Sequence, residues 1–276
     1  MHRKLVIFTL ATYLFSWACW LPIIDSLESS IFAGAPLTIA LFFLGAYGPS
    51  LIGIAMTAIY GGRAAVKSLF KSAVSLRVGA RWLLVSLLTG PLIYAFATAA
   101  YVFAGGETGA INLGLLPWLP IVFIVPLVFG PLAEEFGWRG FALPLLDTEN
   151  KAVTSSIVIG FIWALWHAPL FWAKTGTAIS GFAIDAYLIG LFFLAVIGSS
   201  FIYTWLFNRT RSLAVAILLH LGMNASGTIA GMLFPEMSLS QRLDLYEMYV
   251  ATLWVVVVAS AVITRARAGV AAQSAR

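Results

Sequence analysis

The stretch Gly130-Pro131-Leu132-Ala133-Glu134-Glu135-Phe136-Gly137-Trp138-Arg139-Gly140 decides how this chain folds. It places two adjacent carboxylates and an arginine at the end of a long apolar run, from Leu115 to Ala133. A charged side chain in membrane hydrocarbon costs roughly 2.5–3.5 kcal/mol on insertion scales. Three ionisable groups at this place therefore indicate one polar, water-accessible site, around which the apolar runs of the chain fold.

The composition excludes an ordinary soluble domain. Of the 276 residues, 61% are hydrophobic and 10% are charged, whereas soluble chains carry about 25% charge. The pI near 9.5 does not predict a nucleic-acid partner, because the basic residues fall in short gaps between apolar runs. The single cysteine, Cys19, lies in an apolar run, which excludes a disulfide framework and a cysteine-based metal site.

The apolar runs predict an all-α, polytopic membrane helix bundle that forms a single domain, residues 1–276. A hydrocarbon core about 30 Å thick needs about 20 apolar helical residues, and eight segments meet this requirement. We therefore expect about eight transmembrane helices, at residues 5–25, 36–60, 82–103, 115–143, 154–173, 183–207, 212–234 and 245–264. The fourth segment contains four prolines, so we expect it to bend.

The basic residues predict the orientation of the bundle. In an eight-span topology, 14 of the 16 lysines and arginines fall on one side, and only Lys174 and Arg242 on the other. Cytoplasmic loops carry the excess of positive charge. We expect an integral protein of a bacterial cytoplasmic membrane with both termini cytoplasmic. The basic gap 63–81 also contains Leu, Phe and Val, and it fits an interfacial amphipathic helix or a plain loop.

Three further polar side chains, His167, His220 and Asn224, lie inside the later apolar runs. His220 and Asn224 are four residues apart, as are Glu135 and Arg139, so each pair shares a helix face. We assign Glu135 to Arg139 as an internal ion pair, which leaves Glu134 for the site. At about 1.5 Å per helical residue, four groups lie at depths that allow them to meet in one pocket, which we expect to open to the cytoplasmic side. These groups are Glu134, His167, His220 and Asn224.

Two kinds of chemistry fit these residues. Glu134, His167 and His220 could be three ligands of a divalent metal such as zinc, although no HExxH motif is present. Without a metal, Glu134 and His167 would activate water. His220 and Asn224 would then donate hydrogen bonds to the oxyanion of a peptide carbonyl. The spacing leaves both mechanisms equally open.

The motifs resemble those of the CPBP (ABI) family of intramembrane proteases, which includes the type II CAAX prenyl endopeptidases. The family pattern is EExxxR on one helix, FxxxH on a second, and HxxxN or HxxxD on a third. Here these read Glu134 to Arg139, Trp163 to His167, and His220 to Asn224. Trp163 stands where phenylalanine is usual, which reshapes the pocket wall but leaves His167 in place. The resemblance covers roughly residues 115–230.

The resemblance implies an eight-helix endopeptidase that hydrolyses peptide bonds near the cytoplasmic membrane face. Carried over by position, Glu134 and His167 would activate water, and His220 and Asn224 would stabilise the oxyanion. Glu135 and Arg139 would support the site. The family is often labelled a metalloprotease, yet a glutamate mechanism has also been argued for it. Its partners would be a peptide or protein substrate and the lipid bilayer, and the sequence does not identify a prenylated substrate.

Two alternatives come from other classes of protein. A transporter or proton-coupled carrier would use the Glu and His side chains as a relay, and proline-broken helices suit it. The sequence shows no paired halves of the kind that inverted repeats leave. A non-catalytic membrane protein of the bacteriocin-immunity type would use the same side chains only to hold its fold.

Overall fold

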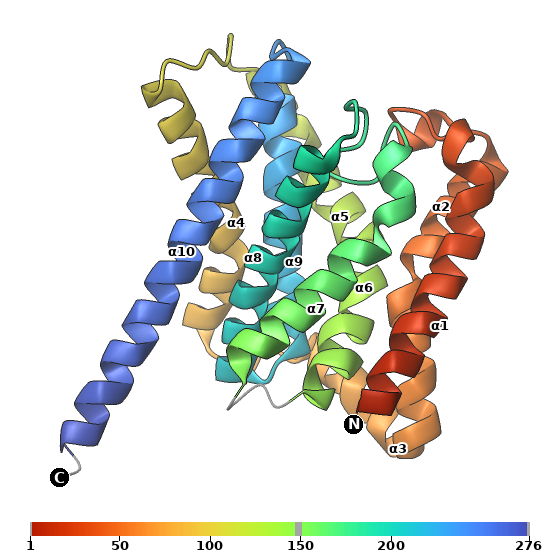
Figure 1. The fold of residues 1–276 in the computed structure, drawn as a ribbon, viewed down its shortest axis with the longest axis vertical. Coiled ribbons are helices and arrows are strands. Elements are labelled where there is room, and N and C mark those ends of the chain that lie inside the picture. Colours follow the sequence, from red (N-terminus) through yellow and green to blue (C-terminus); the bar gives the residue numbers. More distant parts are fainter. Residues whose placement is uncertain (1, 147–150, 275–276) are drawn as a thin grey trace.

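Helices are the only regular secondary structure among the described residues of a computed structural model, which describes residues 2–146 and 151–274, with side chains for 3–146 and 151–262. The all-α prediction is confirmed. The helices run between two ends of one bundle, and α1 begins and α10 ends at the same end (Figure 1). Their bounds are α1 His2–Trp20, α2 Pro36–Ala46, α3 Gly48–Val74, α4 Ala80–Phe103, α5 Leu119–Phe129, α6 Pro131–Gly137, α7 Ala152–Trp166, α8 Ala186–Thr210, α9 Leu213–Leu233 and α10 Leu239–Ser274.

The number of continuous spans is smaller than predicted. By length and composition six helical stretches of the described chain can cross a membrane, or seven if α2 and α3, bent by 47°, count as one. The expected fifth span, residues 154–173, contains an α-helix of only 15 residues, α7. Pro169 has no N–H to donate and cannot continue this helix, so residues Ala168–Trp172 form a 3₁₀ turn instead. The long apolar helices mark an integral membrane protein.

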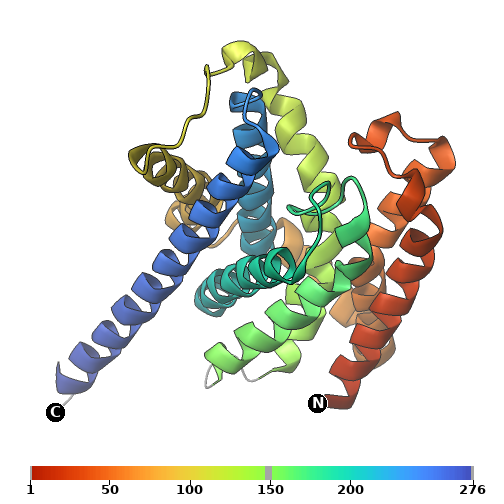
Figure 2. The same ribbon diagram turned by 45° about the horizontal axis from the view of Figure 1, so that its top comes forward.

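The fourth predicted segment is broken, as its prolines led us to expect. A 3₁₀ turn, Leu113–Trp118, leads into α5, and α5 ends at a break where Gly130 separates it from α6. A π-helix, Trp138–Ala142, follows α6 directly. Figure 2 shows α5 and α6 descending one after the other through the bundle. Single π-turns are frequent at functional sites, and this one carries Arg139.

The basic gap after the second segment is helical for most of its length. Helix α3 continues past its predicted end to Val74, with one non-helical residue, Gly62, at φ 68°. Glycine adopts this left-handed conformation without a Cβ clash, so the helix turns there and then resumes. Leu69 on the resumed part packs against Phe136 and Leu213. This outcome favours the amphipathic helix over the plain loop.

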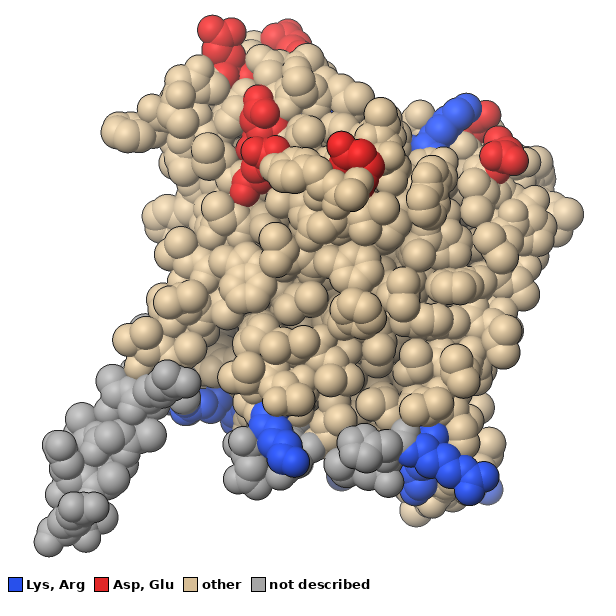
Figure 3. All heavy atoms as spheres, viewed as in Figure 1, with Lys and Arg blue, Asp and Glu red and all other residues tan. Residues whose placement is uncertain are grey.

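Charged side chains gather at the two ends of the bundle and leave an apolar band between them (Figure 3). Most of the Lys and Arg side chains in this view lie at the end where α1 begins, and the acidic side chains lie at the opposite end, which we call the acidic end, together with a basic side chain. Large apolar side chains are exposed on the surface of the bundle, including Leu14 and Phe103. Within the bundle α9 is the most enclosed span and packs against α4, α5 and α6.

Candidate active site

The four side chains predicted to meet do line one cavity, of about 890 Å³. Glu134 comes from α6, His167 follows the last residue of α7, and His220 and Asn224 lie one turn apart on α9. Three separate helices thus bring together residues that are up to 90 positions apart in the chain. Their convergence is an observation, and their individual roles stay predictions.

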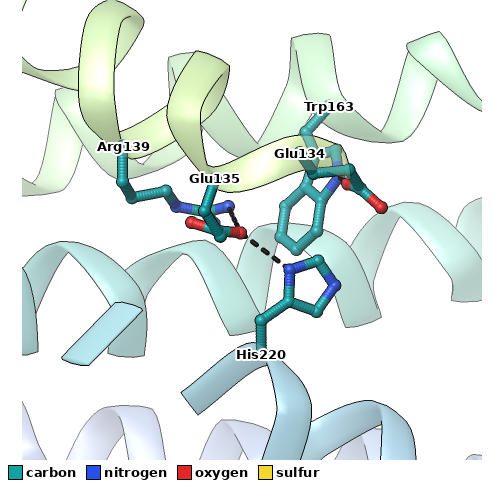
Figure 4. A network of polar contacts seen from close by, with 5 residues as sticks. All are labelled: Glu134, Glu135, Arg139, Trp163 and His220. Atoms are coloured by element: carbon teal, nitrogen blue, oxygen red, sulfur yellow. Dashed lines mark hydrogen bonds and ion pairs between the residues drawn. The ribbon is translucent and has the colours of Figure 1, made fainter. Parts of the chain in front are cut away.

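Glu134 is held by a tryptophan. Its side chain is buried in α6, and Oε2 accepts a hydrogen bond of 2.5 Å from the indole Nε1 of Trp163 on α7 (Figure 4). We expected Trp163 to shape the pocket wall, and this donor role was missed. The signal was available, because the N–H of a buried tryptophan usually finds an acceptor. The bond fixes one carboxylate oxygen and leaves Oε1 to accept from a water or a ligand.

Glu135 is the centre of a buried charge cluster. Its Oε1 accepts hydrogen bonds from Arg139 Nη1 at 2.8 Å and from His220 Nδ1 at 2.7 Å (Figure 4). The predicted Glu135–Arg139 ion pair is confirmed. The contact with His220 was not predicted, because it joins α6 to α9 across 85 residues of sequence. Glu135 therefore both neutralises Arg139 and fixes the orientation of the His220 ring.

Two aromatic rings enclose the Arg139 guanidinium, which has no exposure to solvent. Its Cζ lies 4.3 Å from the centre of the Trp163 ring and 4.0 Å from that of Tyr203. Within the described chain, Nε and Nη2 of Arg139 have no hydrogen-bond acceptor. Ring faces attract a cation electrostatically and can replace part of the lost hydration. Trp163 thus supports Arg139 through its ring and Glu134 through its N–H.

His167 has a defined tautomer. Its Nδ1 lies 2.9 Å from the backbone carbonyl of Trp163, and a carbonyl oxygen can only accept a hydrogen bond. Nδ1 therefore carries the proton, and in the neutral ring Nε2 is a free acceptor. The ring packs against Trp166 at 4.6 Å and Phe192 at 5.4 Å between ring centres, which restricts its rotation. This arrangement suits a base.

Asn224 faces the cavity from α9. Its side chain is exposed there, although most of its neighbours on α9 are buried, and none of the described residues forms a hydrogen bond with its amide. A Cβ placed on Gly130 would lie 2.6 Å from Asn224 Nδ2 and 3.8 Å from His220 Nε2. A side chain at residue 130 would therefore have to displace the Asn224 amide, while the contact with His220 would be an ordinary one.

The zinc alternative does not fit the observed arrangement. Among the described residues, no three side chains of His, Cys, Asp or Glu form a group that could hold a metal ion. Glu134, His167 and His220 line the same cavity, but they do not form such a group. One oxygen of Glu134 is also engaged by Trp163. We therefore derive no step through a metal.

The cavity opens toward the acidic end of the bundle, whereas we expected it to open on the side that carries most of the lysines and arginines. Its wall continues from the four polar residues to residues 175–182 and 227–239 and to Arg242, all toward the acidic end of the bundle. No lysine is among the lining residues. Helix α7 starts at the basic end, so His167 and the segment after it necessarily lie toward the acidic end. Depth estimates from residue counts could place the groups together but could not show on which side the space is open.

Comparison with known proteins agrees with this site. A family model described as type II CAAX prenyl endopeptidase Rce1-like matches residues 116–226, which include all three motifs. The chain is also 29% identical, over 143 residues, to CAAX prenyl protease 2 of Methanococcus maripaludis. That alignment covers 51% of this chain and 49% of the relative, so the chain spans about half the length of the curated relative it matches. The matched region, whose motif residues line one cavity, makes this part of the chain similar to the Rce1-like type II CAAX prenyl endopeptidase (CPBP) family.

Proposed function

We propose that this protein is an intramembrane endopeptidase that cleaves a peptide segment admitted to the cavity. The observation that carries the proposal is the wall of that cavity, where Glu134, His167, His220 and Asn224 face one space large enough for a peptide. Each side chain except Asn224 is held by a hydrogen bond to a second group. Such support holds a catalytic group in one geometry before the substrate arrives.

In the proposed reaction, Glu134 and His167 act on one water molecule. The water oxygen attacks the carbonyl carbon of the substrate while its proton passes to Glu134 or to Nε2 of His167. The former carbonyl oxygen then carries the negative charge of a tetrahedral intermediate. The C–N bond breaks, the proton passes to the leaving nitrogen, and the products are a carboxylic acid and an amine.

Asn224 and His220 are the proposed donors to the developing oxyanion. The Asn224 amide can donate through Nδ2 without losing another bond in the described structure. His220 already donates through Nδ1 to Glu135, so it can donate through Nε2 only as an imidazolium. Removing one donor of this kind typically lowers kcat by about 10²–10³. We therefore expect Asn224→Ala to lower kcat by that range and to change KM little.

The direct test is cleavage of a peptide library by the purified protein, read by mass spectrometry. Because the matched relative is named a CAAX prenyl protease, the library includes peptides with and without a prenylated C-terminal cysteine motif. Glu134→Gln and His167→Ala should abolish cleavage while the protein still inserts and keeps its melting temperature. Glu28→Gln is the matched control, since Glu28 forms an exposed ion pair with Lys174 and neither residue lines the cavity.

Full activity in both Glu134→Gln and His167→Ala would contradict the proposal. The competing proteins give different results in the same assay. A proton-coupled carrier would show pH-dependent flux into proteoliposomes without any cleavage product. A non-catalytic immunity protein would show neither flux nor cleavage, and its phenotype would survive both substitutions.

A further inference from the structure

Helix α7 ends with carbonyl groups that its own backbone cannot pair. The last four carbonyls of an α-helix have no N–H partner within the helix. Here the backbone N–H of His167 turns back to the carbonyl of Ala164 at 3.2 Å, and the nitrogen of Pro169 has no hydrogen to donate. Carbonyl groups in the last turn of α7 therefore need donors from elsewhere in the chain.

Helix α1 supplies two such donors. The hydroxyl of Tyr13 donates to the carbonyl oxygen of Ile162 at 2.5 Å. The indole Nε1 of Trp17 donates to the carbonyl oxygen of Trp166 at 2.9 Å. Each bond joins residues 149 positions apart and connects α1 to the neighbouring α7 (Figure 1). The rings of Tyr13 and Trp17 are stacked, with 5.1 Å between their centres, and together these two side chains form what we call the α1 clamp.

The turn that the α1 clamp holds orients both side chains that are proposed to act on water. The carbonyl of Trp163 lies within this turn and accepts from Nδ1 of His167 at 2.9 Å, which fixes the tautomer of that ring. The indole N–H of the same Trp163 donates to Glu134. A shift of this turn would therefore move His167 and Glu134 together.

Helix α1 acts on the site from a distance. No described residue of α1 lines the cavity, and α1 lies outside residues 116–226, which match the family model. Its contribution to catalysis would therefore pass through α7. A hydrogen bond that fixes the backbone beside a catalytic group can support that group without contact with the substrate.

We infer that Tyr13 and Trp17 are positioning residues of the active site, which hold His167 and Glu134 in their reactive orientation through the last turn of α7. The α1 clamp keeps the carbonyl of Trp163 in place as the acceptor for Nδ1 of His167, so that Nε2 of this ring stays free to accept a proton. The effect on cleavage rests on the proposed function, whereas the effect on the His167 ring does not.

The first test removes each hydrogen bond of the α1 clamp and keeps an aromatic ring. Tyr13→Phe and Trp17→Phe are made singly and together, and kcat and KM are measured on the library peptide that the wild-type protein cleaves fastest. A misplacement of about 1 Å, caused far from the chemistry, can lower a rate about a hundredfold. We therefore expect kcat of the double variant to fall roughly ten- to hundredfold with KM nearly unchanged, and kcat of each single variant to fall less.

Trp20→Phe is the matched control. Trp20 lies on the same helix, and its indole Nε1 also donates to a backbone carbonyl at 2.9 Å, but to that of Phe42 on α2. Its ring packs against Trp166 with 4.8 Å between ring centres, so the control also loses packing at the end of α7. Trp20→Phe should lower the melting temperature as much as Trp17→Phe does and leave kcat unchanged. An equal loss of kcat in both variants would overturn the inference, because packing alone would then explain it.

Nitrogen NMR of isotope-labelled histidine tests the α1 clamp without any need for activity. The chain has three histidines, at positions 2, 167 and 220, and His167→Gln assigns the signals of His167 by their loss. These signals show which ring nitrogen carries the proton. The wild-type ring should carry it on Nδ1, and so should the ring in Trp20→Phe. In the Tyr13→Phe/Trp17→Phe protein, a second form with the proton on Nε2 should appear.

The two readouts separate this inference from the proposed function. An unchanged His167 spectrum or an unchanged kcat in the Tyr13→Phe/Trp17→Phe protein would refute the positioning role and leave proteolysis intact. If the wild-type protein cleaves no peptide, the proposed function fails, and the spectra alone then decide whether the α1 clamp orients His167.

Discussion

Trp163→Phe isolates a single hydrogen bond at the centre of the site. The substitution keeps an aromatic ring over Arg139 and removes the N–H that donates to Glu134 at 2.5 Å. A hydrogen bond to a charged group contributes about 1.5–3 kcal/mol. If that bond orients Glu134 for the attack, kcat should fall roughly ten- to hundredfold with KM nearly unchanged. Phenylalanine is the usual residue of the family here, so the protein should fold.

The assay measures kcat and KM on the best library peptide, together with the melting temperature. Trp138→Phe is the matched control, because Trp138 is also completely buried and its Nε1 has no hydrogen-bond partner among the described residues. Trp138→Phe should leave kcat unchanged, although it loses about as many packing contacts as Trp163→Phe does. Equal activity of Trp163→Phe and the wild-type protein would refute the reasoning. An equal loss of kcat in both variants would show that packing, and not the hydrogen bond, is responsible.

Three other predictions follow from the same geometry. Glu135→Gln leaves the buried Arg139 cation without its anionic partner, so the free energy of unfolding, measured by thermal unfolding, should fall by about 3–5 kcal/mol. Glu134→Gln should not cause this fall. Gly130→Ala places a Cβ 2.6 Å from Asn224 Nδ2 and should lower kcat at least tenfold, whereas Gly190→Ala, with no atom within 4 Å, should not. A strong chelator should leave cleavage unchanged; activity that disappears and returns with added zinc would contradict the metal-free mechanism.

The break between α5 and α6 explains how a membrane bundle can hold three charged groups. Buried ions need partners, and a broken helix supplies space and free backbone groups where a continuous helix would not. Gly130 makes the break, and the π-helix that begins at Trp138 continues the same segment. Between these two irregular points lies the short helix that carries Glu134 and Glu135. The local irregularity of this segment is therefore a condition for the site and not a defect of the fold.

Much of the architecture could be predicted because it depends on local properties of the chain. Apolar runs of about 20 residues must become helices in a membrane, since only internal hydrogen bonds can satisfy their backbone there. Residues four apart must share a helix face, so the Glu135–Arg139 pair followed from spacing alone. Polar side chains in apolar runs must also avoid lipid, which predicted that Glu134, His167, His220 and Asn224 would meet.

The tertiary structure alone decided how these groups are connected and where the site is open. The hydrogen bonds from Trp163 to Glu134 and from His220 to Glu135 join residues that are 29 and 85 positions apart in the chain. The spacing of residues along a helix does not predict pairs of this kind. The end of α7 at Trp166 places His167 at the turn into the mouth. The side on which the cavity opens depends on which helix ends pack together and which diverge, a property of the whole bundle and not of any one stretch of sequence.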